Sequence, residues 1–293
     1  MKIIPWLMVF LLILGGGVTA FVLNAVAQHI ERSHVDAVYD RRDSIKILNK
    51  CVQFAGSHSL PVGEIIATIC QSYLHTPYVA HTLENGAEER LIINLRELDC
   101  MTYVENCLAL ARTIKAEHTS FATFADNLEK IRYRHGLRNG YTSRLHYFSE
   151  WIADNCQKGI VETLPFEVPL TVNVNFMSTH PDSYEVLKAN PALVPEIAAR
   201  EKAINAMPHV YIPKDKIADC ESQLQSGDII GITTSVSGLD VVHDGILLRL
   251  DDGRIHVIHA SSSLGEVVIS TEPLPAFIMQ RKSYTGIMVV RAK

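Results

Sequence analysis

The chain has 293 residues, 47% of them hydrophobic, with a formal net charge of −5 and a sequence pI of about 6.2. This length and apolar content are sufficient for the core of one large domain or two small ones. A weakly acidic chain with no long basic run argues against nucleic acid as a partner.

The first 27 residues contain an apolar run from Ile3 to Leu23. The letters AVA at 25–27 form the small-x-small pattern that precedes a signal-peptide cleavage site, so we expect a signal peptide over 1–27. The run is also just long enough to span a bilayer, so an uncleaved anchor through residues 3–23 stays open. We expect residues 28–293 to form a single monomeric domain. Both alternatives place this domain in the periplasm or outside the cell. The second would also anchor it to the inner membrane.

Helical periodicity recurs through the first half of this body, in the segments 63–74, 121–133 and 143–159 and after Cys100. Gly159 is a natural end for the third of these ranges. Residues 181–207 read as two short helices interrupted by Pro191 and Pro195, which form an insertion or a helical flap.

From residue 227 onward the pattern changes to β-branched runs separated by turns. The runs are GDIIGITT (227–234), VVHDGILLRL (241–250), RIHVIHA (254–260), EVVIS (266–270) and GIMVVR (286–291). Helices followed by an antiparallel meander predict an α+β fold.

Six cysteines, at positions 51, 70, 100, 107, 156 and 220, invite disulfides in an oxidising compartment. Seven helical residues would hold the Cα atoms of Cys100 and Cys107 about 10 Å apart, which is too far for a bridge. One or two bridges among the other cysteines remain open. The spacings contain no paired CxxC, so we expect no structural zinc site.

Cys100 lies in the segment LRELDCMTYVENCLALARTI (95–114), where an extended stretch gives way to an amphipathic helix. Asp99 is the expected N-cap, with Cys100 in the first turn. The positive end of the helix dipole and the free backbone N–H groups favour the thiolate, which is the nucleophilic form. The alternative is a small buried hydrophobe, as most free cysteines are.

Two histidines in the predicted sheet could serve such a nucleophile. His243 opens one strand and His259 ends the next, and a tight turn at 251–253 pairs these strands antiparallel. The two histidines should therefore be neighbours at one end of the sheet, as a base and its orienting partner require. A helix packed on that sheet would bring Cys100 to His243. Glu105 lies five residues after Cys100, so we interpret it as structural.

A metal site is a competing interpretation of the same residues. His256 and His259 form an HxxH pattern, but residues three apart in a strand point to opposite faces. Cys100, His243 and His259 could bind zinc, yet no fourth ligand is evident nearby. We therefore expect no metal.

Several of these motifs occur in one order that resembles the NlpC-type papain-like cell-wall cysteine hydrolases. They are TPYV at 76–79, an Asp-Cys at a helix start, and the strands GDIIGI, VVHDGILL and IHASS. The resemblance implies a papain-like fold with Cys100 as nucleophile, His243 as base, His259 as third polar residue and no cofactor. It also implies that Tyr78 lies near the nucleophile and that the backbone N–H of Cys100 helps to form an oxyanion hole.

Further motifs resemble one specialised branch, the N-acetylmuramoyl-L-alanine amidases long catalogued as a domain of unknown function. They are the segments 88–114, 140–155 and 284–291, and the resemblance covers most of residues 60–293. It implies cleavage of the amide between N-acetylmuramic acid and L-alanine in peptidoglycan fragments (muropeptides). Where the common strand reads His-Val-Gly, this chain has Asp244, which strand alternation predicts to point away from the site.

Peptidoglycan stems carry carboxylates, amides and sugar hydroxyls, so their pocket needs cationic and hydrogen-bonding groups. Arg144 is expected near a helix start, where it could clamp a carboxylate through two hydrogen bonds. The remaining candidates for substrate binding are Tyr78, Ser143, His146, Tyr147 and Asn175. The competing interpretation is a solvated helix end, a core tyrosine and an ordinary loop.

Two other functions fit the same residues. One is an endopeptidase of this fold that cuts within the stem peptide. The other is a non-catalytic, membrane-tethered module that binds the cell envelope, in which Cys100 would be inert. Product analysis separates the first from an amidase, and the reactivity of Cys100 tests the second.

Overall fold

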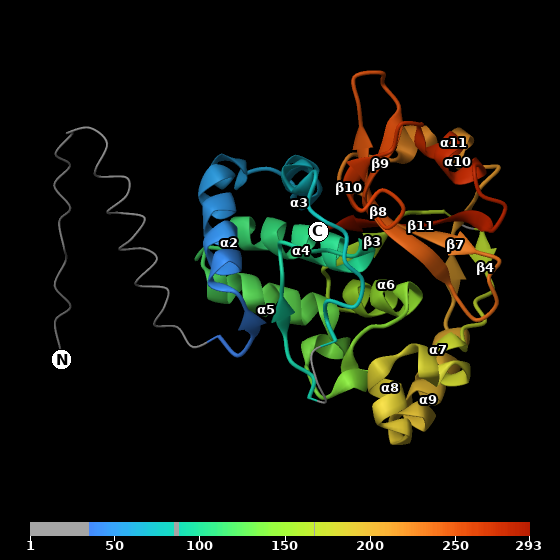
Figure 1. Ribbon diagram of the computed structural model, residues 1–293. Coiled ribbons are helices and arrows are strands. Elements are labelled where there is room, and N and C mark those ends of the chain that lie inside the picture. Colours follow the sequence, from blue (N-terminus) through green and yellow to red (C-terminus); the bar gives the residue numbers. More distant parts are fainter. Residues whose placement is uncertain (1–34, 85–87, 167) are drawn as a thin grey trace, which may run out of the picture. The chain divides into compact units, whose positions relative to one another are not determined.

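The central element is a seven-stranded sheet whose pairings are all antiparallel, with strand order β10-β9-β8-β7-β11-β3 and β6 also paired to β11. This computed structural model describes residues 35–84, 88–166 and 168–293, and those from Asp36 onward form one unit (Figure 1). The strands are β3 (Val161–Thr163), β6 (Ile212–Pro213), β7 (Ile229–Thr234), β8 (Val241–Arg249), β9 (Ile255–Ser261), β10 (Glu266–Ile269) and β11 (Tyr284–Ala292). The predicted α+β fold with an antiparallel sheet is confirmed.

The larger helices precede this sheet in the chain, as predicted. They are α2 (Arg41–Gln53), α3 (Val62–Cys70), α4 (Cys100–Lys115), α5 (Phe121–Arg132) and α6 (Phe148–Gln157). Helix α2 was not predicted. Two small pairings stand apart from the main sheet, β1 (Val38–Tyr39) with β2 (Ile92–Ile93) and β4 (Pro169–Leu170) with β5 (His209–Val210). The predicted signal peptide or anchor, residues 1–27, lies outside the described residues, and within the described residues no helix is long and apolar enough to cross a bilayer.

Helices cover both faces of the sheet. Helix α4 contacts β8 and β9, and α3 packs beside it (Figure 1). On the opposite face, α10 (Ile217–Cys220) and α11 (Leu274–Met279) bury a cluster that includes Leu247 of β8 and Val257 of β9. Because successive strand residues point to opposite faces, adjacent residues of β8 meet different helices.

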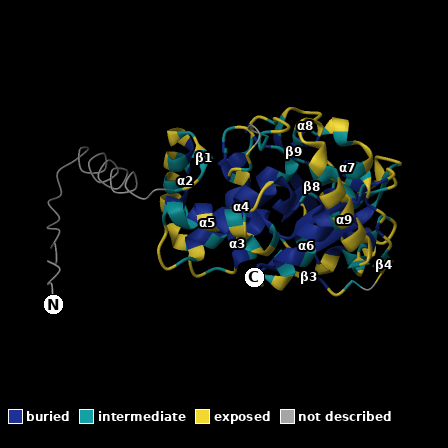
Figure 2. Ribbon diagram, turned by 90° about the horizontal axis from the view of Figure 1, so that it is seen from below, coloured by how far each residue is buried: buried dark blue, intermediate teal, exposed yellow. Residues whose placement is uncertain are grey.

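Helix α4 is buried on nearly every side, in contrast to the amphipathic helix that its spacing predicts (Figure 2). Several of its polar residues are buried too and have partners: Glu105 binds Arg132 at 2.6 Å, and the Thr113 hydroxyl donates to the Ala109 carbonyl at 2.7 Å. Helices α3 and α5 cover the polar side. Glu105 is structural, as predicted.

The predicted helix over 143–159 is wrong at its start, because α6 begins only at Phe148. Arg144 has extended backbone (φ −66°, ψ 141°) and forms an antiparallel bridge with Tyr133, while the Leu145 N–H donates to the Arg132 carbonyl at 3.0 Å. These long-range backbone hydrogen bonds outweigh the local helical periodicity. Gly159, at φ +66°, follows the end of α6 as predicted.

The insertion at 181–207 holds α8 (Glu185–Ala189) and α9 (Val194–Asn205), and α7 (Phe176–Thr179) precedes it. Pro191 begins a short turn between α8 and α9, as the sequence indicates. Pro195 instead lies in the first turn of α9, where a helix needs no N–H from that residue. It does not interrupt the helix.

All six cysteines are free, so the bridges that the sequence left open do not form here. Cys51, Cys70 and Cys107 are buried among apolar side chains, and burial raises the pKa of each thiol. They behave as small core residues. Cys100 keeps part of its surface accessible.

Candidate active site

Cys100 is the first residue of α4, and a capping box fixes this helix end. The Thr102 N–H donates to Asp99 Oδ1 at 2.8 Å, and the Asp99 N–H donates to Thr102 Oγ1 at 2.9 Å. The predicted N-cap is confirmed. The TPYV segment runs alongside, because the Leu98 N–H donates to the Pro77 carbonyl at 3.0 Å. Cys100 is thus held where the extended segment meets the helix.

Tyr78 lies close enough to Cys100 for their charges to interact. Burial raises the pKa of Tyr78 to about 12, and the negative charge of an ionised Cys100 contributes to the rise. The resemblance to the papain-like hydrolases placed this tyrosine near the nucleophile, and the structure agrees with that placement.

His243 and His259 form a hydrogen-bonded pair across β8 and β9, as predicted. His243 Nε2 lies 2.7 Å from His259 Nδ1, and the two rings meet edge-on. Burial lowers the pKa of His243 to about 3 and that of His259 to about 4. Both imidazoles are therefore neutral near pH 7. The His259 ring also packs against Phe277 of α11.

Cys100 and His243 line the same cavity, which has a volume of about 230 Å³ and is called the Cys100 cavity below. Much of its wall is aromatic, contributed by Tyr147, Phe148, Trp151 and Tyr184. The structure therefore brings together a thiol at a helix start and an imidazole from the sheet. This is the pairing that nucleophilic catalysis by cysteine uses.

Asp244 also lines this cavity, contrary to the prediction that it points away from the site. The Cys100 thiol meets both the backbone N–H and the carboxyl group of Asp244. Alternation along β8 does separate His243 from Asp244, but α4 packs against the face that carries Asp244. The error lay in assigning α4 to the other face. The side chain is buried, and within the described residues its Oδ1 has no hydrogen-bond partner.

The resting state of Cys100 differs from the expected thiolate. Burial raises the pKa of the thiol well above its usual value, and the carboxylates of Asp244 and Asp99 raise it further. A hydrogen bond from the Asp244 N–H lowers the thiol pKa, but by less than burial and the two carboxylates raise it. Burial also raises the pKa of Asp244 to about 8, with a contribution from Asp240. A base must therefore remove the thiol proton during any reaction.

The candidate substrate-binding residues divide into two groups. His146 and Tyr147 line the Cys100 cavity, whereas Ser143, Arg144 and Asn175 do not. The Arg144 guanidinium binds the Glu89 carboxylate at 2.7 Å. The N–H groups that were expected to clamp a substrate carboxylate are therefore occupied by Glu89. The Ser143 hydroxyl donates to the Gly140 carbonyl at 2.6 Å, and Asn175 precedes α7.

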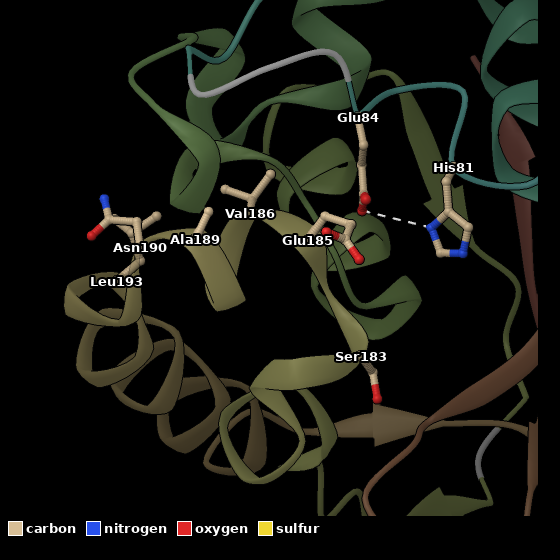
Figure 3. Close-up of a pocket in the computed structure, with 8 residues that line it drawn as sticks. All are labelled: His81, Glu84, Ser183, Glu185, Val186, Ala189, Asn190 and Leu193. Atoms are coloured by element: carbon tan, nitrogen blue, oxygen red, sulfur yellow. Dashed lines mark ion pairs between the residues drawn. The ribbon is translucent and has the colours of Figure 1, made fainter.

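Sequence reasoning missed the wall that the insertion contributes. Tyr184 lines the Cys100 cavity, and its neighbours Ser183 and Glu185 line a second cavity of about 640 Å³. That cavity lies between the insertion and the loop that carries Glu84, and Figure 3 shows the residues that surround it. The sequence signal near this region was the predicted insertion or flap at 181–207, which did not show that Tyr184 reaches the cavity.

The comparison with protein families shows the family to which this chain belongs. Residues 68–287 match the AmiA-like family, described as N-acetylmuramoyl-L-alanine amidase-like. The chain belongs to this family. The matched range contains Cys100, Asp244 and both histidines of the pair.

Solved structures of related proteins support the family assignment. A crystal structure of an N-acetylmuramoyl-L-alanine amidase from Bacteroides uniformis is 39% identical, with a TM-score of 0.75, over 79% of this chain and 99% of that one. A Bacteroides fragilis protein provisionally named a xylanase is 41% identical, with a TM-score of 0.73, over 77% of this chain and 99% of that one. A Legionella pneumophila protein shares the fold at 19% identity, with a TM-score of 0.65, over 91% and 96% of the two chains. No curated protein matches this sequence.

The residues that the structure describes offer no evident donor set for a metal centre. The described part of the chain contains no group of three or more His, Cys, Asp or Glu side chains that could hold an ion. His256 contacts the Asp252 carboxylate at 3.0 Å and the Ser270 carbonyl at 2.9 Å. It points away from His259, as strand alternation predicts.

Proposed function

We propose that this chain is a cysteine-dependent peptidoglycan amidase on an NlpC-type papain-like fold, cleaving the N-acetylmuramoyl–L-alanine bond of muropeptides. The observation that carries the proposal is the Cys100 cavity, in which a helix-start cysteine lies with His243, whose ring is hydrogen-bonded to His259. The family and the amidase from Bacteroides uniformis supply the substrate class.

The proposed reaction begins with transfer of the Cys100 proton to His243. His243 Nε2 is engaged with His259, so Nδ1 is the nitrogen left to accept the proton. His259 thereby fixes the tautomer and the ring orientation. Because the buried thiol and imidazole are both neutral at rest, proton transfer and attack proceed together when substrate fills the cavity.

The sulfur then attacks the lactyl carbonyl carbon, and the carbonyl oxygen becomes an oxyanion. The backbone N–H of Cys100, free at the start of α4, donates a hydrogen bond to that oxyanion. The C–N bond breaks as the His243 imidazolium donates its proton to the L-alanine nitrogen, which releases the peptide. Water, deprotonated by His243, hydrolyses the thioester to the free sugar acid and regenerates the thiol.

The location and substrate size follow from the same reasoning. We propose a periplasmic or secreted protein, on the basis of the apolar run from Ile3 to Leu23, cleaved after Ala27 or left as an anchor. The Cys100 cavity is small, with part of its wall supplied by the insertion, so the proposed substrates are soluble muropeptides, not the intact sacculus.

The test is mass spectrometry of a disaccharide-tetrapeptide incubated with the purified protein, with Cys100→Ala and with Cys156→Ala. Cys156 is the matched control, because it is also a partly exposed free cysteine but lies outside the Cys100 cavity. We expect the parent and Cys156→Ala to release intact tetrapeptide, and Cys100→Ala to release none. A shortened peptide on the sugar would establish the endopeptidase alternative, and no turnover by any protein would favour the binding module.

A further inference from the structure

A third cavity lies beyond His243. It has a volume of about 260 Å³ and is lined by both histidines of the pair, by the serines at 261–263, by Thr271 and by Arg281 at the end of α11. We call it the Arg281 cavity. His243 lines both the Arg281 cavity and the Cys100 cavity, so the two cavities adjoin at this residue.

The lining of the Arg281 cavity is suited to an anion. None of its lining residues is an aspartate or glutamate, and the described part of the chain gives the Arg281 guanidinium no carboxylate partner. The Arg281 guanidinium carbon lies 6.0 Å from the centroid of the Tyr284 ring. Three further side chains in the wall have no hydrogen-bond partner among the described residues, namely Ser262, Thr271 and Gln280.

The proposed reaction fixes which part of the substrate reaches this cavity, so the inference rests on the proposed function. His243 must lie at the L-alanine nitrogen to protonate it, and the departing peptide therefore begins at His243. The aromatic Cys100 cavity contains the sulfur that attacks the sugar's lactyl carbonyl. The peptide then continues on the other side of His243, where the Arg281 cavity opens.

The chemistry of the substrate identifies the anion. The carboxyl group of muramic acid is consumed in the scissile amide, and its acetamido group is neutral. The first free carboxylate along the leaving peptide is the α-carboxylate of the D-glutamyl residue that follows L-alanine. We propose that the Arg281 cavity is the subsite for the leaving stem peptide and that Arg281 binds this α-carboxylate.

The experiment compares two muramoyl tripeptides that differ only in whether the D-glutamyl α-carboxyl is free or amidated. The measured quantity is the ratio of kcat/KM for the carboxylate to that for the carboxamide. We expect a ratio of about ten for the wild type, typical of a charge-assisted hydrogen bond. Arg281→Gln should bring the ratio to about one, mainly by raising KM for the carboxylate.

Two further variants make the result specific. Lys282→Gln removes the same charge from the adjacent exposed residue outside the cavity and should keep the wild-type ratio. Arg281→Lys keeps the charge but loses the planar fork, so its ratio should fall between those of the wild type and Arg281→Gln. A wild-type ratio of one, or a preference that survives Arg281→Gln, would overturn the inference. No release from either substrate by the wild type would contradict the amidase activity itself, and this subsite with it.

Discussion

Asp244 is the residue whose environment most affects the reactivity of Cys100. In the NlpC-type hydrolases that the sequence resembles, valine is common at this position. Here a buried carboxyl touches the thiol, and its charge and hydrogen bond both raise the thiol pKa. The chain therefore keeps the Cys100 thiol protonated more firmly than an apolar neighbour would.

Replacing Asp244 should make Cys100 more reactive. Asp244→Asn removes the carboxylate but keeps the backbone N–H that favours the thiolate, so the thiol pKa should fall by at least about one unit and alkylation should speed up about tenfold. The measurement is the rate of iodoacetamide modification of Cys100 at pH 9, where Asp244 of the parent is ionised, followed by peptide mass spectrometry. Asp251→Asn, in an exposed turn, should keep the parent rate. An unchanged or slower rate in Asp244→Asn would show that the carboxyl does not suppress the thiolate.

The same substitution should change stability in a pH-dependent way. The pKa of Asp244 is raised from 3.8 to about 8 in the folded protein, so the unfolded chain releases this proton first as the pH rises. The carboxyl therefore costs stability progressively between about pH 4 and pH 8. Asp244→Asn should raise the free energy of unfolding at pH 8 by roughly 5 kcal/mol, with little gain at pH 4. Urea titrations at both pH values check this, and an equal gain at both would contradict the raised pKa.

At the scale of elements, the insertion is fastened to the wall of the Cys100 cavity through one tyrosine. The Tyr147 hydroxyl donates to Glu201 of α9 at 2.7 Å and accepts from the Met177 N–H of α7 at 3.1 Å. The Ser178 N–H also donates to Glu201, at 3.0 Å. Glu201 is only 2% exposed, so these donors take the place of water at its carboxylate.

Tyr147→Phe should loosen the insertion while leaving the ring in place. Glu201 and the Met177 N–H each lose a partner, which should cost about 2 kcal/mol. We expect a lower urea midpoint, faster proteolysis within 181–207 and a reduced kcat/KM. The control is Tyr39→Phe, at a tyrosine that is 41% exposed and outside the cavity. Equal protease resistance of Tyr147→Phe and the parent would show that this contact does not hold the insertion.

At the scale of the whole molecule, three buried histidines set the response to acid. Burial lowers the pKa values of His146 and His243 to about 3 and that of His259 to about 4. Because the unfolded chain binds these protons at higher pH than the folded one, their contribution is complete above about pH 6.5 and is lost as the pH falls. Asp244 acts with the opposite sign up to about pH 8, so stability should be greatest near pH 6.5, where the contribution of the three histidines is complete.

The protein should therefore lose stability steeply between pH 6.5 and 5, by about 2 kcal/mol for each buried histidine. His146→Gln removes one titrating group, and its side-chain N–H can still reach the Tyr141 carbonyl that His146 contacts at 2.9 Å. Urea titrations across this range should show a slope in the variant about half that of the parent, because Asp244 already offsets one of the three histidines. His118→Gln, at an exposed position, should retain the parent slope. The same slope in His146→Gln and the parent would contradict the neutral buried imidazole.

Local patterns explain which features could be predicted. The β8–β9 pairing follows from period-two alternation and a tight turn, and it was sufficient to place His243 beside His259. The N-cap at Asp99 follows from the residue types at a helix start. These interactions join residues close in sequence or directly paired, so one sequence contains the necessary information.

The features that escaped prediction depend on packing between distant segments. Which face of β8 receives α4 decides whether Asp244 or His243 touches Cys100, and no local pattern encodes that choice. The Arg144–Glu89 pair joins residues 55 positions apart, and Tyr184 reaches the Cys100 cavity from an insertion. A favourable tertiary contact likewise overrode the helical spacing before Phe148.

The central claim is that Cys100 forms a covalent thioester with the sugar acid. The most direct measurement is rapid acid quenching of the protein during turnover of a disaccharide-tetrapeptide, followed by digestion and mass spectrometry. The account predicts that the peptide containing Cys100 gains the mass of the disaccharide acid minus one water, and that hydroxylamine removes this addition. Peptide release with no addition at Cys100, or with an addition at another residue, would contradict the account.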